Sequence, residues 1–206
     1  MLKHEELKLF DDELRDQYGD NIVGIDDCGN GAWGGPMVAC ACMLPPDLEI
    51  KDLNDSKKLS SKKREELSIF IKENCIEYQI EYVSALELDE NGFVWANRTV
   101  MQRAAEGVTN SVKKVDLYMI DQSPTFMLNP HKMLPKADGL SLSVAAASVI
   151  AKVHRDNYMI ELNKQYPEYH FYSNKGYINT VHIDAVKKHG LIKGIHRHSY
   201  NVKGIN

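Results

Sequence analysis

Residues 21–44, NIVGIDDCGNGAWGGPMVACACML, contain two apolar runs separated by acidic and glycine-rich residues. Residues 21–25 and 37–44 form the two runs, and each is long enough for one strand. Asn30-Gly31 lies between them, and Asn-Gly between apolar runs is a strong signal for a hairpin. The stretch therefore predicts two antiparallel strands, with Asp26-Asp27 where the first strand ends.

On either side of this pair, helical and extended patterns alternate along the chain. Apolar periodicity and end signals predict helices at residues 4–18, from Ser60 or Ser61 to about 75, at 94–109, 140–166 and 180–189. The helix that begins near Ser60 would bury Leu67, Phe70, Ile71 and Cys75. Further strands are predicted at residues 76–83 and 117–120. This order predicts an α/β layer structure, and the length of 206 residues favours a single domain.

Composition limits the function classes only weakly. The net charge of −4 argues against indiscriminate, charge-driven binding to nucleic acid, but local basic clusters such as Lys62-Lys63-Arg64 leave specific binding open. No run approaches the roughly 18 apolar residues of a membrane span, and residues 1–10 lack the apolar core of a signal peptide. Four cysteines without a Cys-x-x-Cys pair fit a reducing compartment. We therefore expect a cytoplasmic protein without a membrane anchor.

Acidic residues follow apolar runs at two places, Asp26-Asp27 and Asp121, and precede the long predicted helix at Asp138. Functional groups gather at strand ends in open α/β sheets, and clustered carboxylates need a cation to stay ionised. An all-oxygen set suits magnesium or manganese. Local features leave a second interpretation open, because Asp26-Asp27 could simply begin a turn and Asp138 could complement the helix dipole.

Geometry adds two conditions. Adjacent residues of a strand point to opposite faces, so Asp26 and Asp27 share a site only if the strand ends or twists between them. Asp138 and Asp156 are 18 residues apart in the sequence, roughly 27 Å along one helix at 1.5 Å per residue. If one helix contains both residues, they are too far apart to bind the same metal cluster.

Several blocks of the sequence resemble ribonuclease HII. Residues 24–31, Gly-Ile-Asp-Asp-Cys-Gly-Asn-Gly, resemble the family signature Gly-Ile-Asp-Glu-Ala-Gly-Arg-Gly. Further blocks in family order are Asn-Asp-Ser-Lys-Lys-Leu at 54–59, the segment 143–156, Asn-Lys-Gly-Tyr at 174–177 and His-Arg-His-Ser-Tyr at 196–200. Together they extend over nearly the whole chain.

The resemblance implies a ribonuclease H-like mixed sheet flanked by helices, with residues about 178–206 as a small helical C-terminal extension of one domain. It implies an endonuclease that cuts the RNA strand of RNA–DNA hybrids, or 5′ of ribonucleotides in duplex DNA, and leaves 5′-phosphates. Such a protein would act as a monomer in DNA replication and repair, using two Mg²⁺ or Mn²⁺ ions. The family's carboxylates map onto Asp26, Asp27, Asp121 and Asp138. Asp156 would then be structural and paired with a basic group.

The resemblance also implies residues that hold the substrate. The backbone of Gly29, Asn30 and Gly31 would read the ribose 2′-hydroxyl, which distinguishes RNA from DNA. Tyr177 would pack on the sugar after the ribonucleotide. Lys57 and Lys175 would hold phosphates.

The sequence departs from the family pattern near these residues. Asp27 replaces Glu, Cys28 replaces Ala and Asn30 replaces Arg, while Gln122 replaces a Gly and Ile178-Asn179 interrupts Gly-Tyr-Gly-Thr. Cys28 either binds soft metal ions or fills an alanine-sized space. Two functions stay open, an active hybrid-cutting endonuclease and a module that binds hybrids or junctions but cuts poorly. The blocks at 54–59 and 143–156 argue against other nucleases of the same fold.

Overall fold

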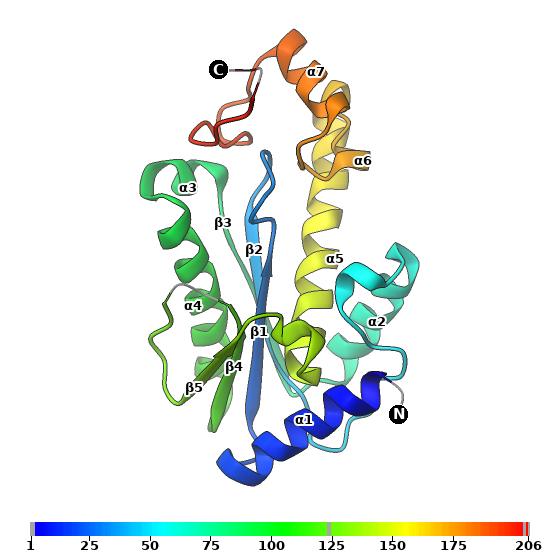
Figure 1. Cartoon of the computed structure of the whole chain (residues 1–206), viewed down its shortest axis with the longest axis vertical. Helices are drawn as coiled ribbons and strands as arrows, with labels where there is room; N and C mark the ends of the chain where they lie inside the picture. The colour runs from blue at the N-terminus through cyan, green and yellow to red at the C-terminus, as the bar shows by residue number, and fades with distance from the viewer. Residues whose placement is uncertain (1–2, 123–124, 204, 206) are drawn as a thin grey trace.

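A five-stranded mixed sheet with the order β3-β2-β1-β4-β5 forms the centre of the computed structural model (Figure 1), which describes residues 3–122, 125–203 and 205. The strands are β1 (Ile22–Cys28), β2 (Met37–Met43), β3 (Glu77–Val83), β4 (Leu117–Asp121) and β5 (His131–Leu134). β1 pairs antiparallel with β2 and parallel with β4, and β5 extends the parallel side. The sheet thus joins an antiparallel half to a parallel half at β1.

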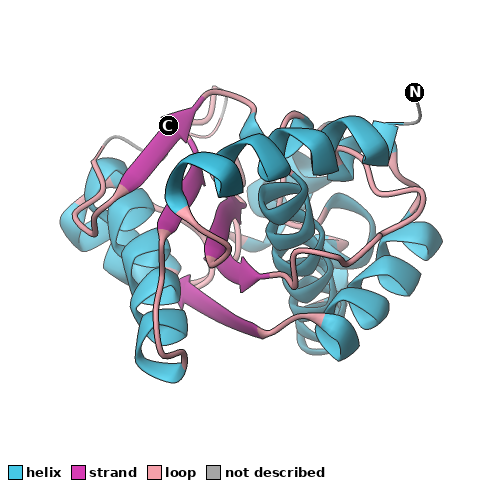
Figure 2. Ribbon diagram, turned by 90° about the horizontal axis from the view of Figure 1, so that it is seen from below, coloured by secondary structure: helices cyan, strands magenta, loops and turns pink. Residues whose placement is uncertain are grey.

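Helices cover both faces of the sheet (Figure 2). They are α1 (Lys3–Tyr18), α2 (Ser61–Asn74), α3 (Ala85–Asn91), α4 (Phe93–Ser111), α5 (Leu142–Gln165), α6 (Phe171–Asn174) and α7 (Thr180–His189). Short 3-10 turns occupy Ser56–Lys58, Ala137–Gly139 and Pro167–Tyr169. None of the helices in the described ranges is long and apolar enough to cross a membrane.

The alternation of side chains in β1 builds a core on each face. Val23 and Ile25 pack into one cluster with residues of α4, whereas Ile22 packs into another with Leu117 and Val144. Gly24 lies between them against the start of α5, where an added Cβ would stand only 2.1 Å from the carbonyl carbon of Ser143. The small residue therefore lets the long helix lie directly on the central strand, next to the acids that follow it.

A third cluster joins the C-terminal part to the rest of the molecule. Trp33 from the β1–β2 connection and Met159 of α5 pack with Phe171 and Val186. Ala32 forms a bridge with Tyr177, and Gly34 forms one with His196. Residues of the C-terminal part thus share this core with the β1–β2 connection and α5. The division into one domain with residues about 178–206 as a helical extension stays a prediction.

Most predicted elements are present, with three differences. The mixed α/β sheet, the antiparallel β1–β2 pair and the expected helices are confirmed. The connection within the antiparallel pair is wider than a two-residue Asn-Gly turn, because residues 29–36 are held by the bridges to the C-terminal part. The predicted apolar stripe of α2 is wrong at Phe70, which is 40% exposed. β5, α3 and α6 were not expected, since each is short.

Candidate active site

Four acidic residues lie around the C-terminal ends of β1 and β4. Asp26 and Asp27 are in the second half of β1, and Asp121 is the last residue of its parallel neighbour β4. Asp138 lies in the 3-10 turn just before α5. Asp121 Oδ1 accepts a hydrogen bond of 2.8 Å from the backbone N–H of Ala137, which ties that turn to the strand. The ends of parallel strands therefore bring together acids that are far apart in the sequence.

A cleft of about 560 Å³ opens at this place. Its lining includes every predicted site residue except Asp138 and Lys175, namely Asp26, Asp27, Gly29, Asn30, Gly31, Lys57, Asp121 and Tyr177. It also includes residues that were not predicted as part of the site: Cys28, Ser56, Gln122, Ser148 and Lys152. Asp138 is buried beside the cleft, and its Oδ2 is 3.6 Å from the ammonium nitrogen of Lys57. The structure thus gathers three of the acids in one cleft and the fourth at its edge.

The two adjacent acids reach the cleft from opposite faces of the sheet. Asp26 hydrogen-bonds Ser148 of α5, whereas Asp27 Oδ1 accepts a hydrogen bond of 3.1 Å from the Nδ2 of Asn97 in α4. β1 continues in regular pairing through both acids as far as Cys28. Its pairing with β4 ends earlier, at Ile25, and both acids line the cleft. The condition that the strand ends or twists between them stays a prediction.

Burial and mutual repulsion make it costly to ionise the acids. Burial, reinforced by the charge of Asp27 and then of Asp121 and Asp138, raises the pKa of Asp26 well above its ordinary value. Burial also raises the pKa of Asp138, against the attraction of Lys57. A group of carboxylates in this state is stabilised by a cation.

Asp27 is half-buried, and two side-chain amides donate hydrogen bonds to its carboxylate. Burial raises its pKa to about 7, while hydrogen bonds from the side chains of Asn97 and Asn30 act in the opposite direction. Two of the three positions where residues 24–31 depart from the family signature, Asp27 and Asn30, are therefore in contact with each other. Sequence reasoning assigned Asn30 only a role toward the substrate.

The donor set fits divalent ions that prefer oxygen. Among residues 3–122, 125–203 and 205, no three His, Cys, Asp or Glu side chains form a group ready to hold a metal ion. The acids instead border an open cleft. Oδ2 of Asp27 is buried without a hydrogen-bond donor, and Oδ2 of Asp138 is buried with only the ammonium of Lys57 at 3.6 Å. Buried carboxylate oxygens with so few donors are costly. Carboxylate oxygens are ligands that suit Mg²⁺ and Mn²⁺.

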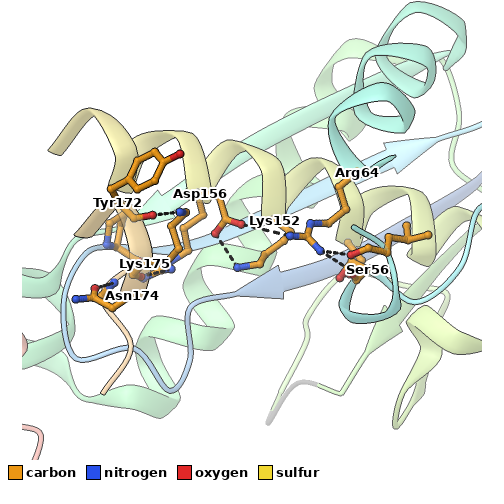
Figure 3. Close-up of polar contacts among 12 residues, drawn as sticks. Ser56, Arg64, Lys152, Asp156, Tyr172, Asn174 and Lys175 are labelled. Atoms are coloured by element: carbon orange, nitrogen blue, oxygen red, sulfur yellow. Dashed lines mark hydrogen bonds and ion pairs between the residues drawn. The ribbon is translucent and has the colours of Figure 1, made fainter. Parts of the chain in front are cut away.

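The predicted substrate residues fall into two places. Gly29, Asn30, Gly31, Lys57 and Tyr177 line the cleft with the acids. Lys175 does not line this cleft, because it lies at a separate cleft with Arg64, Asp156 and Tyr172 (Figure 3).

Gly29 and Asn30 are held in position by neighbouring segments. Gly29 has a φ of +93°, and an added Cβ would stand 2.4 Å from the Nε of Arg155. The carbonyl of Asn30 accepts hydrogen bonds from Arg197 Nη1 at 3.0 Å and from Tyr200 Oη at 2.7 Å. The segment 196–200 thus supports the loop beside the acids.

Some residues near the acids were missed in the sequence. Ser148 and Lys152 line the cleft, and Ser56 Oγ is 3.0 Å from Ser148 Oγ. Ser148, Lys152 and Asp156 are spaced by four residues, so they lie on one face of α5, and this spacing could have identified them. Asn97 had no comparable signal, since it is 70 residues away from Asp27 in the sequence.

Asp156 has the structural environment that was expected of it. Its Oδ1 is 2.7 Å from the Nζ of Lys152, and its Oδ2 is 3.9 Å from Nη2 of Arg64. It does not line the cleft of the other acids. Pairing with basic groups is therefore confirmed.

Cys28 is expected to be chemically inert. Burial raises the pKa of its thiol to about 12, so almost no thiolate is present at neutral pH, and the thiolate is the form that reacts and binds soft metals. We expect iodoacetamide, and Zn²⁺ in a separate assay, to inhibit the protein and its Cys28→Ala variant equally. Inhibition at least about threefold stronger for the unmodified protein would contradict this expectation and would support the soft-metal interpretation.

Comparisons with known proteins agree with this geometry. The family model described as Ribonuclease HII matches residues 23–203. Ribonuclease HII of Clostridium botulinum (strain Loch Maree / Type A3) is 43% identical over 191 residues, 89% of this chain and 70% of that protein. Ribonuclease HII of Shouchella clausii is 38% identical over 197 residues, 96% of this chain and 74% of that protein.

Solved structures show the same fold. RNase HIII of Bst in complex with Mn²⁺ has a TM-score of 0.74 at 16% identity, over 87% of this chain and 67% of that one. RNase HII from the PCNA complex of Archaeoglobus fulgidus has a TM-score of 0.70 at 24% identity, over 89% and 96%. From the family match and the identity to its relatives, the chain belongs to the ribonuclease HII family and is a nuclease, a hydrolase of nucleic acid.

Proposed function

We propose that this protein cuts the RNA strand of RNA–DNA hybrids, or 5′ of ribonucleotides embedded in duplex DNA, and leaves 5′-phosphate ends. The observation that carries the proposal is the set of four carboxylates around the ends of β1 and β4, where Oδ2 of Asp27 is buried without a donor and Oδ2 of Asp138 has only Lys57 at 3.6 Å. The membership of the ribonuclease HII family supports the same reaction. The protein would act on nucleic acid as a monomer, because one chain supplies all four acids.

Asp26, Asp27, Asp121 and Asp138 would hold two divalent ions, Mg²⁺ or Mn²⁺. When bound, such ions supply the Lewis acidity that activates a water molecule and stabilises the leaving 3′-oxygen. The protein's own contribution is to keep the carboxylates buried and close together, so that the cations are attracted strongly. The solved Mn²⁺ complex of Bst RNase HIII is consistent with a divalent ion in this fold.

The remaining residues of the cleft would select and position the substrate. The peptide groups of Gly29, Asn30 and Gly31 would meet the ribose 2′-hydroxyl, and Tyr177 would pack against the next sugar. Lys57 would neutralise a phosphate near the acids, since its side chain is 79% exposed although it lies beside Asp138. The aromatic ring of Tyr177 is 5.5 Å from Nζ of Lys152, which adds a second cation along the same wall.

A direct test uses two substrates and two metals. An RNA–DNA hybrid and a DNA duplex with one ribonucleotide would each be incubated with the protein in Mg²⁺ and in Mn²⁺. We expect cleavage with 5′-phosphate products from at least one substrate, identified by end-labelling. Measurable binding without cleavage under either metal would favour the alternative, a module that holds hybrids or junctions, which the departures at Asp27 and Asn30 suggest.

We expect the protein to work about tenfold faster with Mn²⁺ than with Mg²⁺, the equivalent of roughly 1.4 kcal/mol. Asp27 is one methylene shorter than Glu, so its carboxylate must either draw the backbone inward or bind a metal ion through a water molecule. Mg²⁺ demands near-ideal octahedral geometry with short bonds, whereas the larger Mn²⁺ is expected to tolerate a distorted shell better. Initial rates across a titration of each metal measure the preference, and Asp27→Glu should narrow it.

The amides that contact Asp27 are the reason why Asp27→Glu could lower activity rather than improve it. Asn97 and Asn30 hold this carboxylate, so a longer side chain must displace at least one of them. If the unmodified protein were fully active in Mg²⁺ and Asp27→Glu were slower, the amides would have adapted the site to Asp. The substitution would then be no defect, and the metal preference above would be wrong.

A further inference from the structure

Two histidines are buried together between the C-terminal part and the β1–β2 connection. His182 lies in α7 and His196 in the segment that follows it, and both side chains are completely buried. Their Nε2 atoms are 3.0 Å apart. The rings of Trp33, Tyr169 and Phe171 surround the pair, with centroids 5.2–5.8 Å from one or both imidazoles. The proposed reaction gives this pair no role.

The hydrogen-bond partners of the two rings fix which nitrogen of each carries the proton. The backbone N–H of Ile192 donates to Nδ1 of His196 at 2.9 Å, so the proton of this ring is on Nε2. Nδ1 of His182 lies 3.0 Å from the carbonyl of Tyr177, which can only accept. Nδ1 of His182 therefore donates, and its Nε2 accepts from His196. A single direction of donation runs from Ile192 through both rings to Tyr177.

This chain of hydrogen bonds requires both rings to be neutral. A proton on Nε2 of His182 would face the N–H of His196, and a proton on Nδ1 of His196 would face the N–H of Ile192. Burial lowers the pKa of both rings. Burial, with repulsion from His182 and then from His198, brings the pKa of His196 to about 4. Both rings are therefore neutral at neutral pH.

The chain ends on Tyr177, the residue proposed to pack on the sugar after the ribonucleotide. The backbone N–H of Tyr177 donates to the carbonyl of Asn174 at 2.9 Å, and Tyr177 pairs with Ala32 in a bridge. Its carbonyl is bound by His182. Asn179, the N-cap of α7, accepts from the backbone N–H of His182 at 2.9 Å, so the start of α7 holds the imidazole close to Tyr177.

The second ring belongs to the segment that supports the loop of Asn30. His196 forms a bridge with Gly34 of the β1–β2 connection, beside which the C-terminal segment lies (Figure 1). The next residue, Arg197, donates to the carbonyl of Asn30 at 3.0 Å. Tyr177 and Asn30 both line the cleft of the acids. The contact between the two imidazoles thus joins the support of Tyr177 to the support of Asn30.

We propose that His182 and His196 are positioning residues for substrate recognition, because the hydrogen bond between their rings sets the place of Tyr177 relative to the backbone of Asn30. The consequence is a preference for a ribonucleotide over a deoxyribonucleotide at the cut. This inference rests on the proposed function, because it takes Tyr177 and the peptide groups of Gly29–Gly31 to contact the two sugars. Neither imidazole touches the substrate, since both are completely buried.

The first experiment measures affinity in EDTA, where no cleavage occurs, for two duplexes that differ only in one 2′-hydroxyl. The ratio of the two affinities does not depend on the fraction of protein that is folded. His196→Asn keeps an acceptor for Ile192 but has no donor that reaches His182, so the ratio should fall at least about fivefold. His196→Gln places its amide nitrogen near the position of Nε2 and keeps the donor to His182, so the ratio should stay within about twofold.

His131→Gln is the matched control. His131 also directs Nδ1 at a backbone carbonyl, that of Leu128 at 2.9 Å, and packs against an aromatic ring, Phe126 at 5.6 Å. It begins β5, at the end of the β4–β5 pairing opposite Asp121. The ratio should stay within about twofold in this variant. Urea unfolding of every variant shows whether a loss of stability without a broken ring-to-ring bond leaves the ratio intact, as we expect.

The second experiment tests whether the effect passes through Tyr177. Tyr177→Ala should itself lower the ratio, because it removes the ring that packs on the sugar. His196→Asn should lower the ratio no further in the Tyr177→Ala background, since the ring that it misplaces is already absent. An equal additional loss in that background would overturn the inference, because His196 would then act independently of Tyr177.

A spectroscopic measurement tests the direction of the hydrogen bonds. Long-range ¹H–¹⁵N correlation spectra at neutral pH should show His182 with its proton on Nδ1 and His196 with its proton on Nε2, both rings neutral. A proton on Nε2 of His182, or a charged ring at either position, would overturn the inference.

The outcomes separate this inference from the proposed function. If the unmodified protein prefers the ribonucleotide and cleaves it in Mg²⁺ or Mn²⁺, but His196→Asn and His196→Gln have the same ratio, only this inference fails. If the ratio falls in His196→Asn alone and no cleavage occurs under either metal, only the proposed catalytic function fails. Equal binding of the two duplexes by the unmodified protein would overturn this inference and the proposed recognition of the ribose together.

Discussion

Asp121→Asn and Asp138→Asn should each reduce cleavage of an RNA–DNA hybrid by at least about 10³-fold, which corresponds to roughly 4 kcal/mol of lost transition-state stabilisation. Each substitution removes a negative charge from a site whose proposed task is to attract cations. Asn keeps the shape of the side chain, and in Asp121 it keeps an Oδ1 that can accept the hydrogen bond from Ala137. The fold should therefore survive while the activity is lost.

The measurement is the initial cleavage rate at saturating metal, together with thermal unfolding of each variant. Asp116→Asn is a suitable control, because Asp116 lies next to the opposite end of β4, paired with Lys114 at 2.6 Å. This control should retain its cleavage rate within about twofold, because Asp116, although buried and hydrogen-bonded to Asn21, does not line the cleft of the acids. Full activity of Asp138→Asn under saturating metal would show that Asp138 is not a ligand.

Arg155→Met should lower the free energy of unfolding by about 3–5 kcal/mol, the usual range when one partner of a buried polar network is removed. The Arg155 side chain is completely buried. It donates to the carbonyls of Pro36 at 2.9 Å, Gly34 at 3.0 Å and Lys175 at 2.9 Å. A methionine fills much of the volume but leaves three carbonyls without a donor.

The same substitution should disturb the proposed substrate site. Arg155 joins the β1–β2 connection to the residues before Tyr177, and its guanidinium carbon is 5.2 Å from the ring of Tyr177. Arg155→Lys should rescue only part of the stability, because one ammonium group cannot donate to three carbonyls in fixed directions.

Urea unfolding measures the loss of stability in Arg155→Met and its partial rescue in Arg155→Lys. Arg103→Met is the matched control, since Arg103 is 41% exposed and forms an ion pair of 3.3 Å with Glu87. Exposed ion pairs contribute about 0–1 kcal/mol, so this variant should stay close to the unmodified protein. A loss of stability for Arg155→Met that does not exceed the loss for Arg103→Met would mean that the loop carbonyls find other donors.

Local pattern was enough to predict the elements that carry the acids. Apolar residues before Asp26 and Asp121 identified the two strands, and the long apolar segment after Asp138 identified α5. The predicted helix start at Ser60 is confirmed, since its side chain accepts a hydrogen bond from Lys63 N. These signals are local because they depend on residues within one turn or one strand.

Contacts between distant segments were outside the reach of such patterns. The wide connection between β1 and β2 forms because Ala32 bridges to Tyr177 and Gly34 bridges to His196. These partners are far away in the sequence, so the residues of the connection do not predict them. Short elements such as β5 depend in the same way on a neighbour that is already in place. Sequence reasoning therefore predicted the antiparallel pair but not the width of its connection or the residues that hold it.

The sequence by itself determined which carboxylates are available, on which strands they lie and, through the 18-residue spacing, that Asp138 and Asp156 serve different sites. Only the tertiary structure decided that Asp26 and Asp27 enter one cleft from opposite faces of β1 and that Asn97 holds Asp27. It also decided that Lys175 joins Arg64 in a separate cleft. The physical reason is that strand pairing and helix packing choose the neighbours of a side chain, whereas sequence spacing chooses only its direction along its own element.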